Sequence, residues 1–593
     1  MTVKNSLGAG QLLARSWLLL GEQRRKLPMV FLASALLSLL DTTSVGLVGP
    51  FIASIVSPEI IQNKTWYASI ATIFGTDRSP VTIMASLLLC VFFIKLLGAA
   101  LVLKKIFGFC SALDKRLRHD LLEHYYTIDL SRLTGSSSAG FVQAVHGYTA
   151  QFAYGLVGTQ LRLLTEIIIA TSILGYLFYL NAAALAFLLA LVGVVVFVFD
   201  AVVKKRIHAY GIETANLGED LIRAVQQVTG GIREIRVYGV DDRLLAKAKT
   251  AAERFSELSA KHLWIQAIPK YLIEFCLMAS ICALIMIMQR EQMPREEMLA
   301  LMGVFGIAVM RLTPAANYVL NSLAQLRFSH FVVDRLIDDL DIERSAPPKT
   351  HGTGPKQHAV EFSELELNQL SFRFNAESRE ILSNVNLSIR KGDSIGLIGP
   401  SGGGKTTLAE IMLGLWRPTA GNVSFNGRPV GEYDSAVLMR HFAYIPQQLF
   451  MIDGTLAENI SLLDPASDAK QRAELAANAA QLRSHVSTLP LGLDTPCGEN
   501  GAQLSGGQRQ RVALARAFYH RRSVLIMDEA TSALDYDTER EIIQEIRALK
   551  GKVTLIVIAH RLETVMDCDR IYRVANGAVT EIEKSSLLKG VAQ

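Results

Sequence analysis

A chain of 593 residues is longer than a single domain, and its composition points to two environments. Half of its residues are hydrophobic and its mean hydropathy is +0.28, yet 60 Lys and Arg accompany 55 Asp and Glu. These values argue against a wholly soluble and against a wholly embedded protein. The net charge of +5 is small and spread out, so no nucleic-acid partner is expected.

The cysteines are scattered and show no Cys-x-x-Cys spacing. Three of them fall in apolar runs, so we interpret the set as small core residues in preference to a disulfide framework or a metal site. The N-terminal segment has a short apolar patch but no convincing cleavage site, so no cleaved signal peptide is expected. The cysteines are Cys90, Cys110, Cys276, Cys282, Cys497 and Cys568.

The first half of the chain is predicted to cross a membrane six times, because its apolar stretches reach the ~20 residues that a spanning helix needs. Residues 167–199 hold no charged residue, so the third and fourth spans are expected to meet in a tight turn near Asn181. An even number of spans places both ends of this region on one side. The stretches cover about residues 28–57, 81–108, 155–180, 182–203, 264–289 and 298–320.

Lys and Arg beside the spans predict the orientation. They are frequent before the first span and in residues 104–154, and sparse in the alternate loops. The N-terminus, two long charged loops and the C-terminal half are therefore predicted to face the cytoplasm. The two loops, about 105–154 and 204–263, have helical periodicity and are expected to extend the spanning helices.

Each long loop has a break at its tip, at residues 129–138 and 229–236. We favour short segments that dock on a partner domain over solvated turns, because such long helices would otherwise end without a contact. Between the first two spans, residues 58–80 have near-helical apolar spacing and contain Trp66 and Tyr67. An interfacial helix on the outer face and an ordinary aromatic belt both remain open.

Charged residues inside spans are costly and usually face a cavity. One interpretation is a partly basic pathway for an anionic group, and the other is pairing between helices with snorkelling near the interfaces. Lys270 and Glu274 stand one helical turn apart and could pair. The charged positions are Lys95, Arg162, Glu166, Lys270, Glu274 and Arg311.

Periodicity ends in a segment rich in Pro and Gly, after which short apolar strands alternate with helices. We therefore predict a six-helix membrane domain over 1–340, a linker over 341–358 and an α/β nucleotide-binding domain over 359–593.

The strongest motif is Gly399–Thr406, which has the form G-x-x-x-x-G-K-T between an apolar run, predicted to be a strand, and a predicted helix. Its glycines let backbone N–H groups surround phosphate oxygens of ATP, Lys405 would reach the β and γ phosphates, and Thr406 would ligate Mg²⁺. The predicted cradle comprises Gly399, Pro400, Ser401, Gly402, Gly403, Gly404, Lys405, Thr406 and Thr407.

A second apolar strand, residues 524–527, runs into two carboxylates. Asp528 suits a hold on Mg²⁺, and Glu529 suits polarising the attacking water.

A glycine turn opens a further helix and would offer a second anion site: Ser505, Gly506, Gly507 and Gln508. Because one γ-phosphate needs only one such loop, this second site implies that two copies sandwich the nucleotide. An ordinary helix N-cap would explain Ser505, but we do not expect it to account for the glycines and Gln508.

With these motifs in order, the second half resembles the nucleotide-binding domain of ATP-binding cassette (ABC) transporters. The whole chain resembles an exporter-type half-transporter, a helical membrane domain fused to an α/β P-loop domain. The resemblance implies that Phe374 stacks on adenine, although Tyr is more usual there. It also implies that Gln447 belongs to the Q-loop, where it contacts Mg²⁺ and the γ-phosphate, that Asp535 belongs to the D-loop, and that His560 is the switch histidine. In residues 495–501, which resemble the exporter segment before the signature, Cys497 stands where an aliphatic residue is commoner.

The resemblance further implies a homodimer with two competent ATP sites that drive alternating access. The substrate would be amphipathic. Residues 58–80, the basic residues of the spans and residues 231–239 are similar to bacterial lipid-linked oligosaccharide flippases of the inner membrane. A lipid A or multidrug exporter is the alternative, and a membrane-anchored ATPase without transport is the alternative of another class. The segment before the first span is expected to be too short for a peptidase domain.

Overall fold

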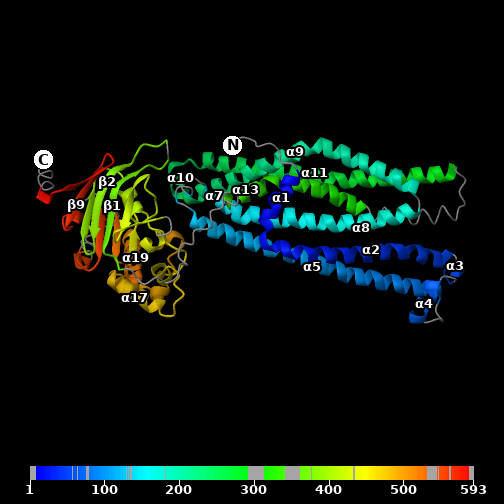
Figure 1. Ribbon diagram of the computed structural model, residues 1–593, viewed down its shortest axis with the longest axis horizontal. Coiled ribbons are helices and arrows are strands. Elements are labelled where there is room, and N and C mark those ends of the chain that lie inside the picture. The colour runs from blue at the N-terminus through cyan, green and yellow to red at the C-terminus, as the bar shows by residue number, and fades with distance from the viewer. Residues whose placement is uncertain are drawn as a thin grey trace. The chain divides into compact units, whose positions relative to one another are not determined.

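The chain forms two compact units in its computed structural model (Figure 1). The first comprises Met1–Tyr126 and Ser136–Ala346, and the second comprises Thr127–Gly135 and Pro347–Gln593. The structure describes residues 9–56, 58–62, 65–74, 79–128, 130, 133, 137–180, 182–290, 313–340, 361–375, 377–431, 435–529, 544, 547–559 and 562–585.

The first unit consists of helices, several of them very long. Helices α5, α9 and α11 contain 48, 49 and 50 residues, more than twice what a bilayer crossing requires. The long polar segments therefore continue the apolar ones as helix, as predicted. The helices are α1 (Ala9–Leu20), α2 (Leu27–Val56), α3 (Pro58–Gln62), α4 (Thr65–Phe74), α5 (Pro80–Thr127), α7 (Ser138–Gln143), α8 (Thr159–Leu180), α9 (Ala182–Gly230), α10 (Ile232–Tyr238), α11 (Asp241–Arg290) and α13 (His330–Asp339).

Shorter irregular helices interrupt this pattern. A 3-10 turn, η1 (Gly21–Lys26), joins α1 to α2, and two π-helical segments, η2 (Ala144–Tyr148) and η3 (Gln151–Gly158), precede α8. Residues 313–328 are also helical. Helices α9 and α11 run side by side (Figure 1).

Among the described residues, four helical stretches are long and apolar enough to cross a membrane. The fourth predicted span lies in α9, and much of the sixth lies outside the described residues, so the number six remains a prediction. The surface of α5 is strongly apolar, since Leu89 is 72% and Leu96 is 64% exposed, as expected of a helix facing lipid. The four stretches are Ala14–Ile52, Pro80–Thr127, Ser138–Gly175 and Arg243–Ala283.

The segment between the first two spans forms α3 and α4, so its predicted helical character is confirmed. Tyr67 is buried with Ile61 and Ile83, whereas Trp66 is exposed. The tip of the first long loop is grouped with the second unit, where Leu130 packs against buried core residues. Whether either tip docks on a partner domain remains a prediction. The second tip contains α10.

In the described part of the second unit, the strands form two sheets. One is antiparallel with order β2-β1-β4-β5, and the other has order β10-β9-β3-β8-β7-β6, parallel except for β10. All residues of β7 and β8 are buried, which is why residues 524–527 and 555–558 are continuous apolar runs. The strands are β1 (Glu364–Phe372), β2 (Leu382–Arg390), β3 (Ser394–Ile398), β4 (Ala420–Phe425), β5 (Arg428–Pro429), β6 (Phe442–Ile445), β7 (Val524–Asp528), β8 (Thr554–Ile558), β9 (Arg570–Ala575) and β10 (Ala578–Ile582).

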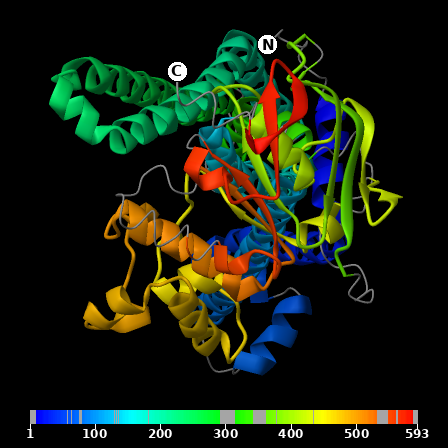
Figure 2. The same ribbon diagram turned by 90° about the vertical axis from the view of Figure 1, so that its left-hand side faces the viewer.

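The helices of the second unit lie partly on the parallel sheet and partly in a separate group. Figures 1 and 2 set α17 and α19 to one side of the antiparallel sheet, and a buried cluster containing Ile460, Leu482 and Val512 joins this group to β7 and β8. The helices are α14 (Lys405–Met412), α15 (Ser435–Met439), α16 (Leu456–Ser461), α17 (Ala469–Ala479), α18 (Arg483–Thr488), η5 (Gly492–Asp494), η6 (Glu499–Gly501), α19 (Gly506–His520) and α21 (Leu562–Val565).

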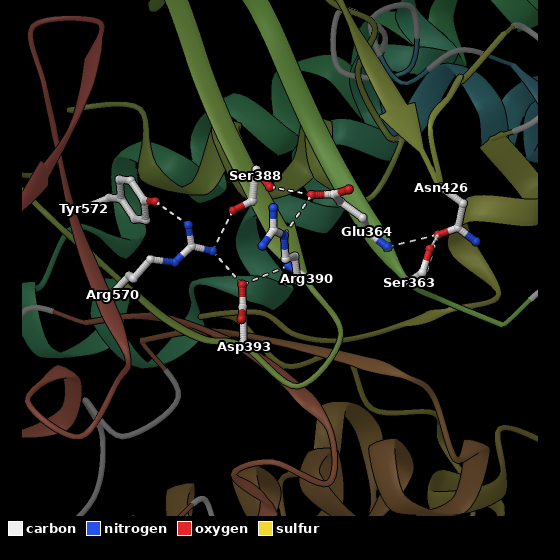
Figure 3. A network of polar contacts seen from close by, with 8 residues as sticks. All are labelled: Ser363, Glu364, Ser388, Arg390, Asp393, Asn426, Arg570 and Tyr572. Carbon is white, nitrogen blue, oxygen red and sulfur yellow. Dashed lines mark hydrogen bonds and ion pairs between the residues drawn. The ribbon is translucent and has the colours of Figure 1, made fainter.

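One arginine connects the two sheets (Figure 3). Arg570 of β9 donates to the carbonyl oxygen of Ser388 in β2 at 2.7 Å and to Asp393 at 2.5 Å. Arg390 of β2 donates to Glu364 of β1 at 3.3 Å. The predicted combination of a helical region and an α/β unit is confirmed.

Candidate functional site

The glycine-rich loop joins β3 to α14 at the carboxyl end of the parallel sheet. Gly399 has φ 150°, and a Cβ atom there would lie 2.1 Å from the carbonyl oxygen of Val574, so only glycine fits. Gly404 has φ 97° and caps α14, whose first residue is Lys405. The predicted strand, loop and helix are therefore all present, and Thr407 lies in the first turn of α14.

Lys405 lies inside this loop. Its side chain is 5% exposed, and its ammonium donates to the carbonyl oxygens of Gly399 and Pro400, each at 3.0 Å. The loop thus holds a buried cation beside the N-terminal N–H groups of α14. Both features attract phosphate groups.

Two candidate metal ligands are in contact. The Thr406 hydroxyl donates to an Asp528 carboxylate oxygen at 2.7 Å, and Asp528, at the end of β7, is 2% exposed. Hard oxygen ligands of this kind suit Mg²⁺, which is commonly held by few protein groups and by substrate phosphates. Among the described residues, no three His, Cys, Asp or Glu side chains gather as a metal cluster.

Tyr444 is an addition that the sequence reasoning missed. It lies in β6 opposite Ile526 of β7, two residues before Asp528. Burial raises the pKa of the Tyr444 phenol, and the negative charges of Asp528 and Glu410 and a hydrogen bond to Asp528 raise it further. Tyr444 is thus a neutral donor that orients Asp528, and its position three residues before Gln447 was the available signal.

The predicted base, Glu529, contacts the predicted Q-loop residue. The Gln447 amide nitrogen donates to Glu529 Oε2 at 2.7 Å. The Glu529 backbone has φ 49°, an uncommon value for a residue other than glycine, and its N–H donates to the carbonyl oxygen of Ile558 at 2.9 Å. β7 therefore ends at Asp528, and the backbone leaves the extended conformation at Glu529.

The predicted adenine-stacking side chain, Phe374, is 47% exposed. It packs edge-on against Trp416, with ring centroids 5.0 Å apart, and against Phe372 at 5.2 Å. Trp416 was also missed. Its indole nitrogen donates to Glu410 at 2.8 Å, which fixes the aromatic group relative to α14.

Ser505 caps α19 in a reciprocal arrangement. Its hydroxyl accepts from the Gln508 backbone N–H at 3.2 Å, and its own N–H donates to the Gln508 side-chain oxygen at 2.8 Å. This capping box explains Gln508, so the expectation that an ordinary N-cap would leave it unexplained was wrong. Gly506 and Gly507 form the first turn. Whether this turn binds phosphate remains a prediction.

The orientation of Gln508 brings in a further residue. Its amide nitrogen lies 3.1 Å from His485 Nδ1 in α18. Cys497 is buried and its N–H donates to the Gly454 carbonyl oxygen, which fits the expected apolar position. Asp535 and His560 lie outside the described residues.

The charged residues of the spans mostly meet other side chains. Lys95 forms an ion pair with Asp41 of α2, a buried carboxylate that the sequence reasoning overlooked. Arg162 lies over the rings of Phe107 and Tyr318, at 5.6 and 5.7 Å. These contacts favour pairing between helices for both cations.

Lys270 Nζ lies 3.9 Å from Glu274 Oε1, so the two residues pair as their spacing predicted. Both side chains are about half exposed. Glu166 also has an interaction partner. Arg311 lies outside the described residues. Of the six cysteines, Cys110, Cys276, Cys497 and Cys568 are buried, and the other two are exposed.

Comparisons with known proteins agree on both units. The family described as ABC transporter matches residues 382–532, and the ABC transporter transmembrane region matches residues 36–312. An ATP-dependent lipid A-core flippase of Polaromonas sp. is 28% identical over 473 residues, 79% of this chain and 78% of that protein. The corresponding protein of Cupriavidus metallidurans is 28% identical over 452 residues, 75% of this chain and 74% of its own.

ABC transporter B family member 29, chloroplastic, of Arabidopsis thaliana is 36% identical over 265 residues, 44% of this chain and 41% of that protein. A solved structure of a bacterial Atm1-family ABC exporter with ATP bound matches with a TM-score of 0.79. It covers 95% of this chain and 96% of the other at 18% identity, which establishes the shared fold.

Proposed function

Because the chain belongs to the ABC transporters, with a transmembrane region and an ATPase domain fused in one polypeptide, we propose that it flips a lipid-linked oligosaccharide or related glycolipid. Its transport is coupled to ATP hydrolysis, and it is an integral membrane protein. The transmembrane family match over residues 36–312 argues against an ATPase that is merely anchored.

In the ATP site we propose, Lys405 binds the β and γ phosphates and Phe374 stacks on adenine. Thr406 and Asp528 would hold Mg²⁺, which supplies charge neutralisation on the phosphates. Glu529 accepts the proton of the attacking water, and Gln447 keeps its carboxylate oriented through the 2.7 Å contact. Asp535 and His560 are assigned from the resemblance alone.

The site is proposed to be completed by a second copy of the chain. Ser505–Gln508 of one copy would contact the γ-phosphate of the ATP that is bound in the phosphate loop of the other copy. Gly506 and Gly507 would present N–H groups to it at the start of the 15-residue helix α19. A homodimer would then contain two such sites. We place the ATPase unit and the N-terminus in the cytoplasm, with the helices in a bacterial inner membrane.

The observation that carries the substrate class is the relationship to lipid A-core flippases over more than three quarters of the chain. Both lipid A-like molecules and lipid-linked oligosaccharides join sugars, phosphates and long apolar chains. A lipid A-like substrate is therefore the second candidate. The half-exposed Lys270 could contact the phosphates of either lipid.

The test is the ATPase activity of the purified protein in lipid, with a polyprenyl-pyrophosphate oligosaccharide, with lipid A, or with neither. We expect the oligosaccharide lipid to stimulate turnover more strongly than lipid A. Stimulation by lipid A alone would support the second candidate, and stimulation by neither would overturn both.

A further inference from the structure

The first unit contains a cavity of about 460 Å³ between α9, α11, the π-helical segments and the helix over residues 313–328. This volume falls in the range of small-molecule sites. We propose that the cavity binds the uncharged part of a ligand, rich in hydroxyl and amide groups, as a sugar head group is. The sugar assignment rests on the proposed function, whereas the site itself rests on its own geometry.

The described residues that line the cavity carry no Asp, Glu, Lys or Arg. Four of its polar side chains are glutamines, each of which offers both a donor and an acceptor. A neutral ligand with hydroxyl groups matches such a lining, whereas a phosphate would find no countercharge. The glutamines are Gln143, Gln151, Gln266 and Gln325.

Three of the glutamines belong to one hydrogen-bond chain. The Gln266 amide nitrogen donates to Gln325 Oε1 at 3.1 Å, and Gln325 Nε2 donates to the Ser329 hydroxyl at 3.1 Å. Gln151 Nε2 reaches the same hydroxyl at 3.3 Å. The contact between the two amides orients Gln266 and Gln325 relative to each other.

This chain also determines the state of His262. The Gln266 amide nitrogen lies 2.9 Å from His262 Nε2 and so donates to it, which places the proton of the neutral imidazole on Nδ1. His262 is 7% exposed, and its buried Nδ1 has no hydrogen-bond partner in the part of the chain that the structure describes. The Thr214 hydroxyl, also in the lining, is likewise buried and unbonded. Two buried polar groups of the lining residues are thus left without a partner among the described residues, although buried polar groups are normally bonded, and a ligand oxygen would satisfy them.

Aromatic faces supply the rest of the site. The His262 ring stacks on Phe328, with centroids 3.8 Å apart and planes 20° from parallel. Phe255 and Phe331 also line the cavity. A sugar ring has hydroxyl edges and apolar C–H faces, so it fits a cavity that combines amides with aromatic rings.

The wall of the cavity is held by a close backbone approach. A Cβ atom on Gly211 of α9 would lie 2.3 Å from the carbonyl oxygen of Phe328. The glycine thus allows α9 to lie directly against the helix that carries Gln325. The cavity residues lie where the long polar segments are predicted to meet the spans on the cytoplasmic side, where a head group would be loaded.

The test measures binding of N,N′-diacetylchitobiose to the full-length protein in nanodiscs by saturation-transfer NMR. Thr214→Val removes the unbonded hydroxyl at nearly constant volume, and Gln266→Leu removes the donor to His262. We expect each change to weaken binding of the disaccharide about tenfold. Gln227→Leu, at an exposed position of α9, is the matched control and should bind as the wild type does.

A second arm of the experiment compares ATPase stimulation by two lipids: polyprenyl pyrophosphate that carries the same disaccharide, and polyprenyl pyrophosphate alone. The cavity variants should lose the part of the response that depends on the sugar and keep the response to the bare lipid. Equal disaccharide binding by wild type and both variants, or no binding by any of them, overturns the site. If the disaccharide binds in the cavity but neither lipid stimulates wild type, the site stands and the proposed flippase function fails.

Discussion

Glu529 is the residue on which turnover should depend most. Glu529→Gln keeps the size and the contact with Gln447 but removes the basic carboxylate, so ATP should still bind while hydrolysis falls roughly 10²–10⁴-fold. Nucleotide binding and phosphate release, measured on the same preparation, check both parts. Near wild-type hydrolysis would remove Glu529 from its role.

His485 is predicted to position the start of α19. Because Gln508 Oε1 accepts from the Ser505 N–H, its amide nitrogen must donate to His485 Nδ1. His485→Leu should lower the ATPase rate about fivefold, for the ~1 kcal/mol that such a hydrogen bond contributes.

His485→Asn places an amide oxygen near the position of Nδ1 and should restore most of the rate. Equal losses in the two variants would mean that the packing of α18, and not this hydrogen bond, is what matters.

At the residue scale, the sequence predicted groups that lie in contiguous motifs. Lys405, Thr406 and Asp528 were recognised because a phosphate loop and a strand ending in a carboxylate have fixed local spacing. Tyr444 stands three residues before Gln447, but its contact with Asp528 depends on the fold, and His485 lies in no motif and acts on a residue from another part of the chain. The positive φ of Glu529 also depends on the fold.

At the scale of elements, Arg570 should stabilise the junction of the two sheets. Its partners, Asp393 and the Ser388 carbonyl, are partly buried and would lose a charged donor in Arg570→Met (Figure 3). We expect a loss of about 1–3 kcal/mol in the free energy of unfolding of the ATPase unit.

Thermal unfolding followed by near-UV circular dichroism measures this effect. Arg390→Met is the matched control, because the Arg390 side chain is 76% exposed and its pair with Glu364 should contribute little. Equal destabilisation by the two changes would show that Arg570 has no special structural role.

The Asp41 and Lys95 pair should hold α2 against α5. Asp41 is 2% exposed, so Lys95→Met leaves a carboxylate buried beside an apolar side chain, at a cost of about 3–5 kcal/mol. The double variant Asp41→Leu with Lys95→Met should recover stability, measured as the melting temperature in detergent.

Lys270→Met serves as the comparison, since Lys270 is 54% exposed and 3.9 Å from Glu274. If the Lys95→Met and Lys270→Met variants had the same melting temperature, the ion pair of Asp41 and Lys95 would not contribute to helix packing.

Elements with a clear period were predicted well. The long helices and the strand before the phosphate loop follow directly from apolar spacing. The π-helical segments η2 and η3 could not be predicted from apolar spacing, because the same spacing also fits an ordinary α-helix and does not show their extra residue per turn. The capping box at Ser505 was present in the sequence, but we interpreted Gln508 only as part of an anion site.

At the scale of the whole molecule, the order of motifs identified a transporter with a fused ATPase domain, and the comparisons confirm this. The substrate could not be predicted with the same certainty, because head-group recognition depends on side chains from several helices. The cavity around His262 draws on residues from 143 to 331, which no local motif connects.

The measurement that tests the central claim most directly is transfer of a fluorescent lipid-linked oligosaccharide across proteoliposomes that contain the purified protein. We predict transfer that requires ATP and Mg²⁺, is lost in Glu529→Gln and exceeds the transfer of labelled lipid A. ATP hydrolysis without any transfer of the oligosaccharide lipid, in vesicles shown to be sealed and correctly oriented, would contradict the account.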